Sequence, residues 1–256
     1  MKFVLYNIRY GTGGNVKYGG FLPYITGYLS GTAKHIKTIG EFLKEESPDV
    51  VGLVEVDLGS IRHQFQNQVE SLGSCLNHFN VHQVKYGDNS KFNNFPIIRN
   101  QGNAFLYKDD FHNINFHHFD EGTKTLIIEL ELEEVTFFLV HLALGSKTRL
   151  KQITQLYKLV KDSKKPVIIG GDFNLMLGEV EIELFLEASG LINPNKAQLP
   201  TFPSWKPSKH LDFILHSPEI KVNDFRVPPV TLSDHLPLIL DFEIDHKILG
   251  NVVYIK

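Results

Sequence analysis

The sequence predicts an α+β sandwich in which two mixed β-sheets pack together and helices flank them. Apolar segments typical of strands alternate along the chain with segments of helical spacing. Two of the strand-like segments are joined as a hairpin. No linker rich in Ser, Pro or Gly and no charge run divides the 256 residues, so we expect a single domain over residues 1–256. Packing the two sheets face to face, with helices outside, is the simplest way to bury both kinds of element.

In the first half, two apolar strands alternate with two helical patterns. The strands are predicted at residues 3–8 and 50–54, and we expect the second to end at Glu55. The helical patterns repeat apolar residues three or four positions apart, at Ile36, Ile39 and Leu43 and again at Ile61, Phe65, Val69 and Leu72. Pro48 lies just beyond the first pattern, where a helix commonly stops.

The second half begins with the hairpin. Residues 126–132 alternate between apolar and mostly polar side chains, Glu133 and Glu134 can form the turn, and residues 135–140 return as a strand. Helices are predicted around residues 150–160 and 179–188. Further strands are predicted at residues 166–169, 211–215 and 238–242, the first leading into Gly170, Gly171 and Asp172.

The composition is that of an ordinary globular protein. Against 26 Lys and Arg there are 29 Asp and Glu, so the formal net charge of −3 argues against a strongly basic nucleic-acid coat. The lone Cys75 excludes a disulfide framework and a zinc site made of cysteines only. No secretory signal or apolar membrane span is recognised, which predicts a cytoplasmic protein, and no obligate protein partner is indicated.

Acidic, amide and imidazole side chains fall at or near the ends of the predicted strands. They are Asn7, Glu55, His141, Asp172, Asn174, Asp212, Asp234 and His235. A single polar residue at a strand end is usually a turn former or a cap, but such positions also carry function on a rigid scaffold. Asp212 differs, because an ionised carboxylate within an apolar strand is costly unless a cation or hydrogen-bond donors pair with it.

The chemistry of this set suits the hydrolysis of a phosphate ester. Carboxylate oxygens together with an Asn carbonyl suit a hard cation such as Mg²⁺, for which Mn²⁺ could substitute. Two imidazoles and a carboxylate can polarise a phosphate or deprotonate a water. A metal, an activated water and donors to the phosphorus oxygens are what this hydrolysis needs.

Six short segments carry recognisable motifs: Asn7-Ile8-Arg9, Gly52-Leu53-Val54-Glu55-Val56, His141-Leu142, Gly171-Asp172-Phe173-Asn174, Leu211-Asp212-Phe213-Ile214 and Ser233-Asp234-His235-Leu236-Pro237. In this order they resemble the endonuclease/exonuclease/phosphatase superfamily over nearly the whole chain, and Thr201-Phe202-Pro203 also looks like the family's pattern. The superfamily includes deoxyribonucleases, abasic-site endonucleases, neutral sphingomyelinases and inositol-phosphate phosphatases. The resemblance implies a four-layer α/β sandwich and a Mg²⁺-dependent hydrolase of phosphodiesters or phosphomonoesters.

The resemblance also implies a role for each position. The implied metal ligands are Glu55, Asn7 and Asp234. The implied catalytic residues are Asp172, which would activate the water, His141, Asn174, and His235 with Asp212 as the partner of its imidazole. The implied substrate-binding residue is Asn174. Arg9 and Arg149 are further candidates for binding a substrate phosphate near the strand ends, although a solvated helix face explains Arg149 about equally well.

Two departures from the family pattern bear on the substrate. Deoxyribonuclease-like members have a basic residue two positions after the glutamate, where this chain has Asp57, which we expect to repel phosphate. Those members also pair the first histidine with a carboxylate from a strand near residues 102–107, where this chain offers neutral Gln101 and Asn103. A phospholipid or sugar-phosphate phosphoesterase therefore stays open beside a nuclease, as does a phosphate-binding module without catalysis.

Overall fold

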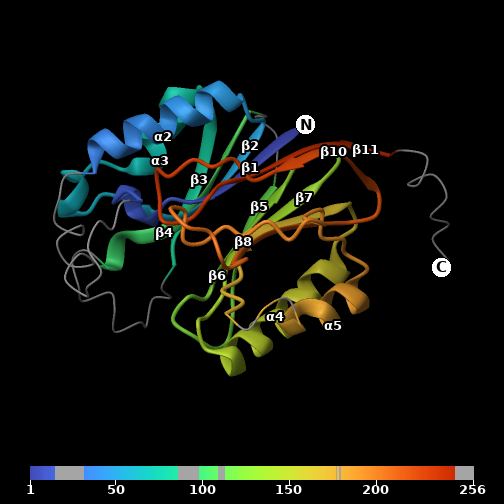
Figure 1. Cartoon of the computed structure of the whole chain (residues 1–256). Helices are drawn as coiled ribbons and strands as arrows, with labels where there is room; N and C mark the ends of the chain where they lie inside the picture. The colour runs from blue at the N-terminus through green and yellow to red at the C-terminus, as the bar shows by residue number, and fades with distance from the viewer. Residues whose placement is uncertain (15–31, 86–97, 109–112, 177, 179, 246–256) are drawn as a thin grey trace.

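Two β-sheets pack face to face in the computed structural model, which describes residues 1–14, 32–85, 98–108, 113–176, 178 and 180–245 (Figure 1). The six-stranded sheet has the order β10 (Ile220–Arg226), β11 (Leu238–Ile244), β1 (Lys2–Asn7), β2 (Val50–Asp57), β4 (Gln101–Tyr107) and β3 (Phe79–Val84). The five-stranded sheet has the order β5 (Asn113–His118), β6 (Leu126–Glu131), β7 (Thr136–His141), β8 (Val167–Asp172) and β9 (Asp212–His216).

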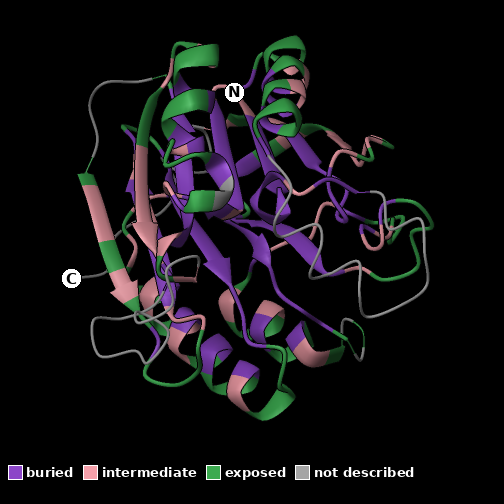
Figure 2. Cartoon of the chain, turned by 90° about the vertical axis from the view of Figure 1, so that its left-hand side faces the viewer, coloured by how far each residue is buried: buried purple, intermediate pink, exposed green. Residues whose placement is uncertain are grey.

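Helices form the two outer layers. The six-stranded sheet is covered by α2 (Ala33–Glu46) and α3 (Gln68–Leu76), and the five-stranded sheet by α4 (Ser146–Asp162) and α5 (Val180–Ser189). Each helix buries one stripe of residues against its sheet, while the strands of the centre are buried almost throughout (Figure 2). The predicted four-layer sandwich is confirmed. None of the helices in the described part of the chain is both long enough and apolar enough to cross a membrane.

The main core lies between the two sheets. Phe3 of β1 and Phe137 of β7 are fully buried there, with ring centroids 5.2 Å apart. Gly170 of β8 permits this close approach, because a Cβ at that position would lie 2.9 Å from the Phe3 ring. The two sheets are therefore in close contact where β1 faces β8, at Gly170, which lies two residues before Asp172.

Strand direction gathers polar residues at one edge of the sandwich. In the first sheet β1 runs parallel to β2, and in the second β7 runs parallel to β8 with His141 opposite Asp172. The antiparallel strand β9 begins beside them, with Asp212 opposite Asp172. Because parallel strands end at the same edge, the tight packing of the two sheets brings Asn7 close to Asp172 across the sandwich.

Two expectations about local structure were wrong. Strand β2 does not end at Glu55 but continues to Asp57, with an irregularity in its pairing to β4 between Leu53 and Val56. The helical pattern from Ile61 to Leu72 forms a helix only from Gln68 onward. Ile61 belongs to a short 3₁₀ turn, η2 (Ile61–His63), and Phe65 has a left-handed backbone with φ of 62°. Both side chains are exposed, so their apolar spacing did not reflect burial.

Two further short 3₁₀ turns complete the described elements, η1 (Arg9–Gly11) after β1 and η4 (Ile98–Asn100) before β4. Four strands, β3, β4, β5 and β10, were not outlined from the apolar pattern, and of these β4 was implied by the family resemblance alone. Three of them, β3, β5 and β10, lie at sheet edges and are only partly buried, which gives them weak apolar alternation.

Candidate active site

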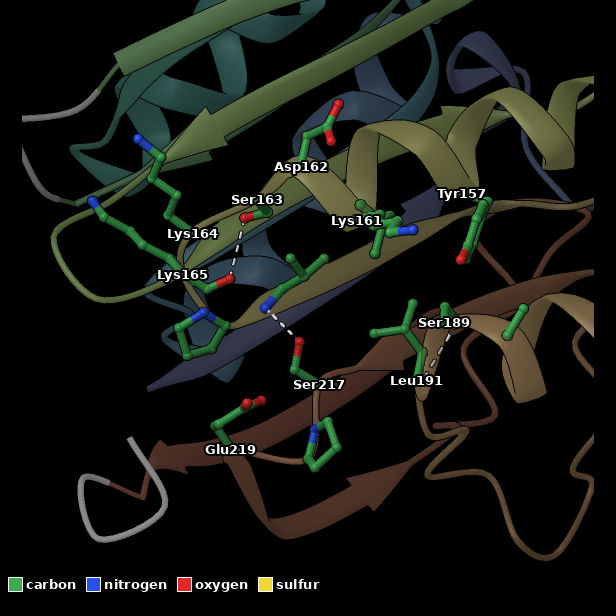
Figure 3. Close-up of a pocket in the computed structure, with 15 residues that line it drawn as sticks. Tyr157, Lys161, Asp162, Ser163, Lys164, Lys165, Ser189, Leu191, Ser217 and Glu219 are labelled. Atoms are coloured by element: carbon green, nitrogen blue, oxygen red, sulfur yellow. Dashed lines mark hydrogen bonds between the residues drawn. The ribbon is translucent and has the colours of Figure 1, made fainter. Parts of the chain in front are cut away.

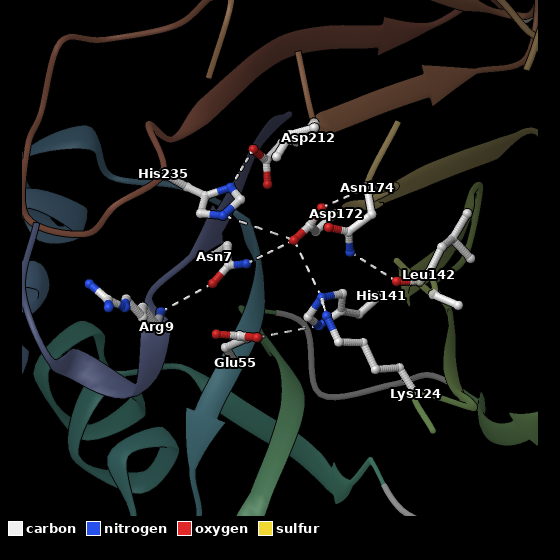
Figure 4. Close-up of polar contacts among 12 residues, drawn as sticks. Asn7, Arg9, Glu55, Lys124, His141, Leu142, Asp172, Asn174, Asp212 and His235 are labelled. Carbon is white, nitrogen blue, oxygen red and sulfur yellow. Dashed lines mark hydrogen bonds and ion pairs between the residues drawn. The ribbon is translucent and has the colours of Figure 1, made fainter. Parts of the chain in front are cut away.

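A pocket of about 220 Å³ opens at the edge where these strands end. Its lining residues come from both sheets and from the loops between them. They are Asn7, Arg9, Glu55, Lys124, Leu144, Asp172, Asn174, Met176, Phe202, Leu211, Asp234 and His235. The structure thus brings together most of the residues singled out from the sequence, with Asp212 and His141 in direct contact with the lining (Figure 4).

Asp172 occupies the centre of the site (Figure 4). Its Oδ2 accepts a hydrogen bond from Asn7 Nδ2 at 3.1 Å and lies 3.3 Å from His141 Nε2 and 4.0 Å from His235 Nε2. Its Oδ1 accepts from the backbone N–H of Asn174 at 3.0 Å. Burial alone would raise the pKa of Asp172, but His141 and then His235 hold it well below its usual range. Asp172 is therefore an ionised carboxylate in contact with one amide and two imidazoles.

Asn174 follows Asp172 in a left-handed conformation, with φ of 54°. This turn allows its amide nitrogen to donate to the carbonyl of Leu142 at 2.9 Å, which ties the end of β8 to the end of β7. The side chain is 3% exposed and lines the pocket. An amide nitrogen has two hydrogens, so one remains for a ligand.

A bulge in β2 sets the direction of the Glu55 side chain. The residue has φ of 59° at the irregularity in the β2–β4 pairing, and its backbone N–H donates to Asn103 Oδ1 at 3.2 Å. Bulges re-aim side chains and are common beside active sites. Burial would raise the pKa of Glu55, but Lys85, His141 and Lys124 hold it below its usual range.

Asp212 holds the imidazole of His235. Asp212 Oδ2 accepts from His235 Nδ1 at 2.7 Å and from Thr201 Oγ1 at 2.5 Å, whereas its Oδ1 has no hydrogen-bond partner among the described residues. Burial alone would lower the pKa of His235, but Asp212, then Asp172 and Asp234, raise it to about 10. His235 is thus an imidazolium at neutral pH, with Nε2 directed toward Asp172 (Figure 4).

His141 is the opposite case. Burial and the charge of Lys124 lower its pKa to about 4, although Asp172 and Glu55 oppose that shift. Lys124 Nζ lies in hydrogen-bond contact with His141 Nε2. The other ring nitrogen, Nδ1, lies 3.9 Å from Glu55 Oε1 and has no hydrogen-bond partner among the described residues. The two histidines of the site therefore differ in charge.

Arg9 and Asp234 form an ion pair at the far side of the pocket. Arg9 Nε lies 3.4 Å from Asp234 Oδ2, and the Arg9 backbone N–H donates to Asn7 Oδ1 at 3.1 Å. Burial raises the pKa of Asp234, which His235 and Arg9 oppose. Arg9 thus lines the pocket as expected but shares its charge with a carboxylate.

The donor set fits a hard cation. The carboxylate of Glu55 accepts no hydrogen bond from any described residue, although its side chain is only 18% exposed and lines the pocket. Asn7 and Asp234 add oxygen atoms to the same lining. A separate group, Asp172, Asp212 and His235, also has ligand atoms that all lie within 4.8 Å of one another. In that group, however, Asp212 Oδ2 and His235 Nδ1 are already hydrogen-bonded to each other. The Glu55 carboxylate is therefore more available to a cation than either of these atoms.

Two residues lie differently from their predicted places. Arg149 is 1% exposed: its guanidinium pairs with Glu181 and donates to the carbonyls of Ala143 and Leu144 at 2.9 and 2.8 Å. It supports the loop after β7 instead of facing a substrate. Asp57 is fully buried, and its carboxylate accepts hydrogen bonds from the backbone of Gly59 and Ser60, so it shapes a turn and does not line the pocket.

Several residues of the site were not singled out for these roles. Lys124 comes from the loop between β5 and β6, Asn103 supports Glu55, and Thr201 holds Asp212. Lys124 has no motif that could have revealed it. Phe202 also lines the pocket, with its ring centroid 4.9 Å from that of His235.

A larger cavity of about 690 Å³ lies at the opposite end of β8, beside Val167 (Figure 3). Several of its polar side chains are already engaged within the fold. Ser217 Oγ accepts from the Val167 N–H, and Lys165 pairs with Glu131. Because the described lining of this cavity includes no imidazole and two carboxylates, Asp162 and Glu219, the smaller pocket is the better candidate for chemistry.

Comparison with known proteins agrees with this geometry. The model of the Endonuclease/Exonuclease/phosphatase family matches residues 4–235. None of the curated proteins matches the chain in sequence. Among solved structures, an endonuclease/exonuclease/phosphatase family protein from Bacteroides thetaiotaomicron is 15% identical, with a TM-score of 0.67 and 94% of each chain covered.

Two other similar structures have a described activity or ligand. A mannosyl-6-phosphatase from Bacteroides thetaiotaomicron is 16% identical, with a TM-score of 0.67, 95% of this chain covered and 100% of that chain. The human Nocturnin catalytic domain, solved with a bound sulfate anion, is 20% identical, with a TM-score of 0.64, 95% of this chain covered and 93% of that chain. At these identities the likeness shows the fold.

Proposed function

This chain belongs to the endonuclease/exonuclease/phosphatase family of phosphoric ester hydrolases, and from that premise we propose that it hydrolyses a phosphate ester by in-line attack of a water on phosphorus, in a reaction that depends on a divalent cation. The observation that carries the proposal is the convergence in one pocket of an ionised Asp172, an imidazolium at His235 and a Glu55 carboxylate that accepts no hydrogen bond from any described residue.

The cation is proposed to bind at Glu55, with Asn7 and Asp234 as additional oxygen ligands. Mg²⁺ suits these hard oxygen donors, and Mn²⁺ can replace it. When bound, such an ion neutralises negative charge on the phosphoryl oxygens and polarises them.

Asp172 is proposed to orient the attacking water and take its proton. Its Oδ2 is the atom on which Asn7, His141 and His235 converge, so a water beside it would be held by several fixed groups. The neighbouring Asn174 keeps one amide hydrogen for a phosphoryl oxygen. Together these groups place the nucleophile before the reaction begins, which is a main source of catalysis by positioning.

His235 is proposed to stabilise the charge that develops on phosphoryl oxygens. Its Nδ1 is bound to Asp212, so Nε2 is the nitrogen that can donate to the substrate. The pKa of about 10 keeps this donor charged through the physiological range. The role of Asp212 is then to fix the orientation of the ring and favour its charged form.

The substrate is proposed to be a small phosphate ester, with a nuclease as the second candidate. The pocket of about 220 Å³ and the net charge of −3 suit a compact ligand better than a long polyanion. Phosphatases occur among proteins of similar fold, such as the mannosyl-6-phosphatase, which makes a sugar phosphate a reasonable first substrate to test.

The test is hydrolysis of aryl phosphate esters, a monoester and a diester, with Mg²⁺ or Mn²⁺ and after chelation. We expect wild-type turnover to require the metal, and Glu55→Gln and His235→Ala to lower it by about 10²- to 10⁴-fold. Glu243→Gln and His118→Ala, both at exposed positions, serve as matched controls. If both site variants kept wild-type activity, the proposed function would be wrong.

A panel of sugar phosphates, phospholipid headgroups, RNA and plasmid DNA at low and high salt separates the two substrate classes. A nuclease loses affinity steeply as salt rises, because binding displaces counterions from the backbone, whereas a small ester depends on salt much less. Phosphate binding without turnover on every substrate would instead indicate a binding module.

A further inference from the structure

Lys124 contributes a positive charge to the pocket that no carboxylate neutralises by contact. Its Nζ contacts the imidazole of His141, and it forms no ion pair with a carboxylate among the described residues. The other positive side chains of the described lining are each paired with a carboxylate, Arg9 with Asp234 and His235 with Asp212. An ammonium group has three hydrogens to donate, and an imidazole nitrogen can accept only one of them.

The loop that carries Lys124 is held in place by a buried glutamine. Gln152 of α4 is 1% exposed, and its Nε2 donates to the carbonyls of Glu121 and Lys124 at 2.9 and 3.0 Å. Its Oε1 accepts from the backbone N–H of Ala143 at 2.8 Å, two residues after His141. One buried side chain thus connects the loop that carries Lys124 to the segment that directly follows His141.

Gly122 allows the loop to approach Gln152 this closely. It has φ of 111°, and a Cβ at this position would lie 2.7 Å from Gln152 Nε2. The path of the backbone before Lys124 is therefore constrained both by conformation and by hydrogen bonding. Lys124 differs in this respect from an ordinary surface lysine, whose position is set by its own flexible stem.

The other groups near Lys124 are already assigned to different tasks. Glu55 and Asp172 are the carboxylates whose charges interact with Lys124, and both are assigned above to the cation and the water. The remaining hydrogens of Lys124 are therefore available to an anion that enters the pocket.

We propose that Lys124 binds a nonbridging oxygen of the substrate's phosphoryl group and thereby favours the doubly charged phosphate of a monoester. This inference rests on the proposed function, since it assumes that the phosphoryl group occupies this pocket. A fixed positive charge interacts more strongly with the dianion of a monoester than with the monoanion of a diester. Lys124 is thus a substrate-binding residue that discriminates by charge.

The first experiment measures binding of inorganic phosphate by calorimetry to wild type, Lys124→Met and Lys124→Arg, each with Mg²⁺ present. We expect Lys124→Met to weaken binding by about 10- to 100-fold, the usual effect of a lost charge-assisted hydrogen bond, and Lys124→Arg to retain most of it. Lys151→Met is the matched control, because Lys151 pairs with Glu121 of the same loop at the surface. Unchanged phosphate binding in Lys124→Met would overturn the proposal.

The second experiment compares KM and kcat for an aryl phosphomonoester and an aryl phosphodiester. We expect Lys124→Met to raise KM for the monoester at least several-fold more than for the diester. Equal losses on both would refute discrimination by charge. If wild type bound phosphate but hydrolysed neither ester, the proposed function would fail while the binding experiment still tested Lys124.

Thermal unfolding of each variant accompanies both measurements. Lys124 is half-buried and lies in a loop, so we expect the methionine variant to fold. If it does not, Lys124→Gln removes the charge while keeping a polar side chain. The same loss of phosphate binding is then expected, and wild-type binding by that variant would equally overturn the proposal.

Discussion

His235 Nδ1 lies 2.7 Å from Asp212 Oδ2, and the same carboxylate oxygen accepts from Thr201 Oγ1 at 2.5 Å. Asp212 is 2% exposed and belongs to the first position of β9, whereas His235 comes from the loop before β11. A carboxylate held rigidly by the second sheet therefore fixes the imidazole of a loop that leads into the first sheet.

Replacing Asp212 by Asn should lower kcat by about 10²- to 10⁴-fold, because His235 loses the charge that keeps it protonated and oriented. NMR titration of the His235 ring in the variant should show a pKa lower than in wild type. Asp224→Asn, at an exposed carboxylate, is the control and should change neither quantity. Wild-type turnover in Asp212→Asn would exclude the proposed role of the pair.

The stability of the metal-free protein should depend on pH through His235. Its pKa is raised to about 10, above the value near 6.5 of an unfolded histidine, so the native state binds the proton more tightly. The resulting stabilisation is fully present below about pH 6.5 and is lost as the pH rises toward about 10.

Denaturant unfolding of chelator-treated wild type and His235→Gln across this range checks the sign. We expect the difference in unfolding free energy between the two proteins to shrink steadily as the pH rises. A constant difference would show that His235 does not titrate with a raised pKa.

Asn103→Ala should impair both folding and activity. The variant leaves the partly buried backbone N–H of Glu55 without its acceptor, and the loss of such a partner costs up to about 1–3 kcal/mol of unfolding free energy. Because Glu55 depends on this contact at its bulge, the concentration of Mg²⁺ needed for half-maximal activity should also rise. Asn80→Ala on the exposed part of β3 is the control, and an unaltered metal requirement in Asn103→Ala would contradict the argument.

Arg149→Met should destabilise the protein without changing substrate affinity. Removing one partner of a buried ion pair costs about 3–5 kcal/mol, and the variant also leaves the carbonyls of Ala143 and Leu144 without donors. Denaturant unfolding measures the loss, and KM is determined well below the unfolding temperature. A large rise in KM with unchanged stability would instead restore Arg149 as a substrate-binding residue.

Much of the fold could be predicted because its determinants are local. The strands β1, β2, β7, β8 and β11 are buried on both faces or nearly so, and their continuous apolar runs can be read without knowledge of the partners. The edge strand β3 has no buried residue, so its pattern is too weak to recognise. Ile61 and Phe65 show the converse error, since apolar spacing alone could not show that they remain exposed.

The candidate site divides in the same way. The sequence by itself determined which polar side chains lie at strand ends, because Asn7 and Asp172 follow continuous apolar runs and Asp212 begins one. Only the tertiary structure decided that Glu55 sits on a bulge supported by Asn103, that Arg149 is buried away from the pocket, and that Lys124 reaches His141 from a loop 17 residues away. A strand and its end can be recognised from the run of apolar residues that the sheet buries. The approach of a loop depends instead on how the two sheets and the buried Gln152 pack together, and no local sequence pattern records that packing.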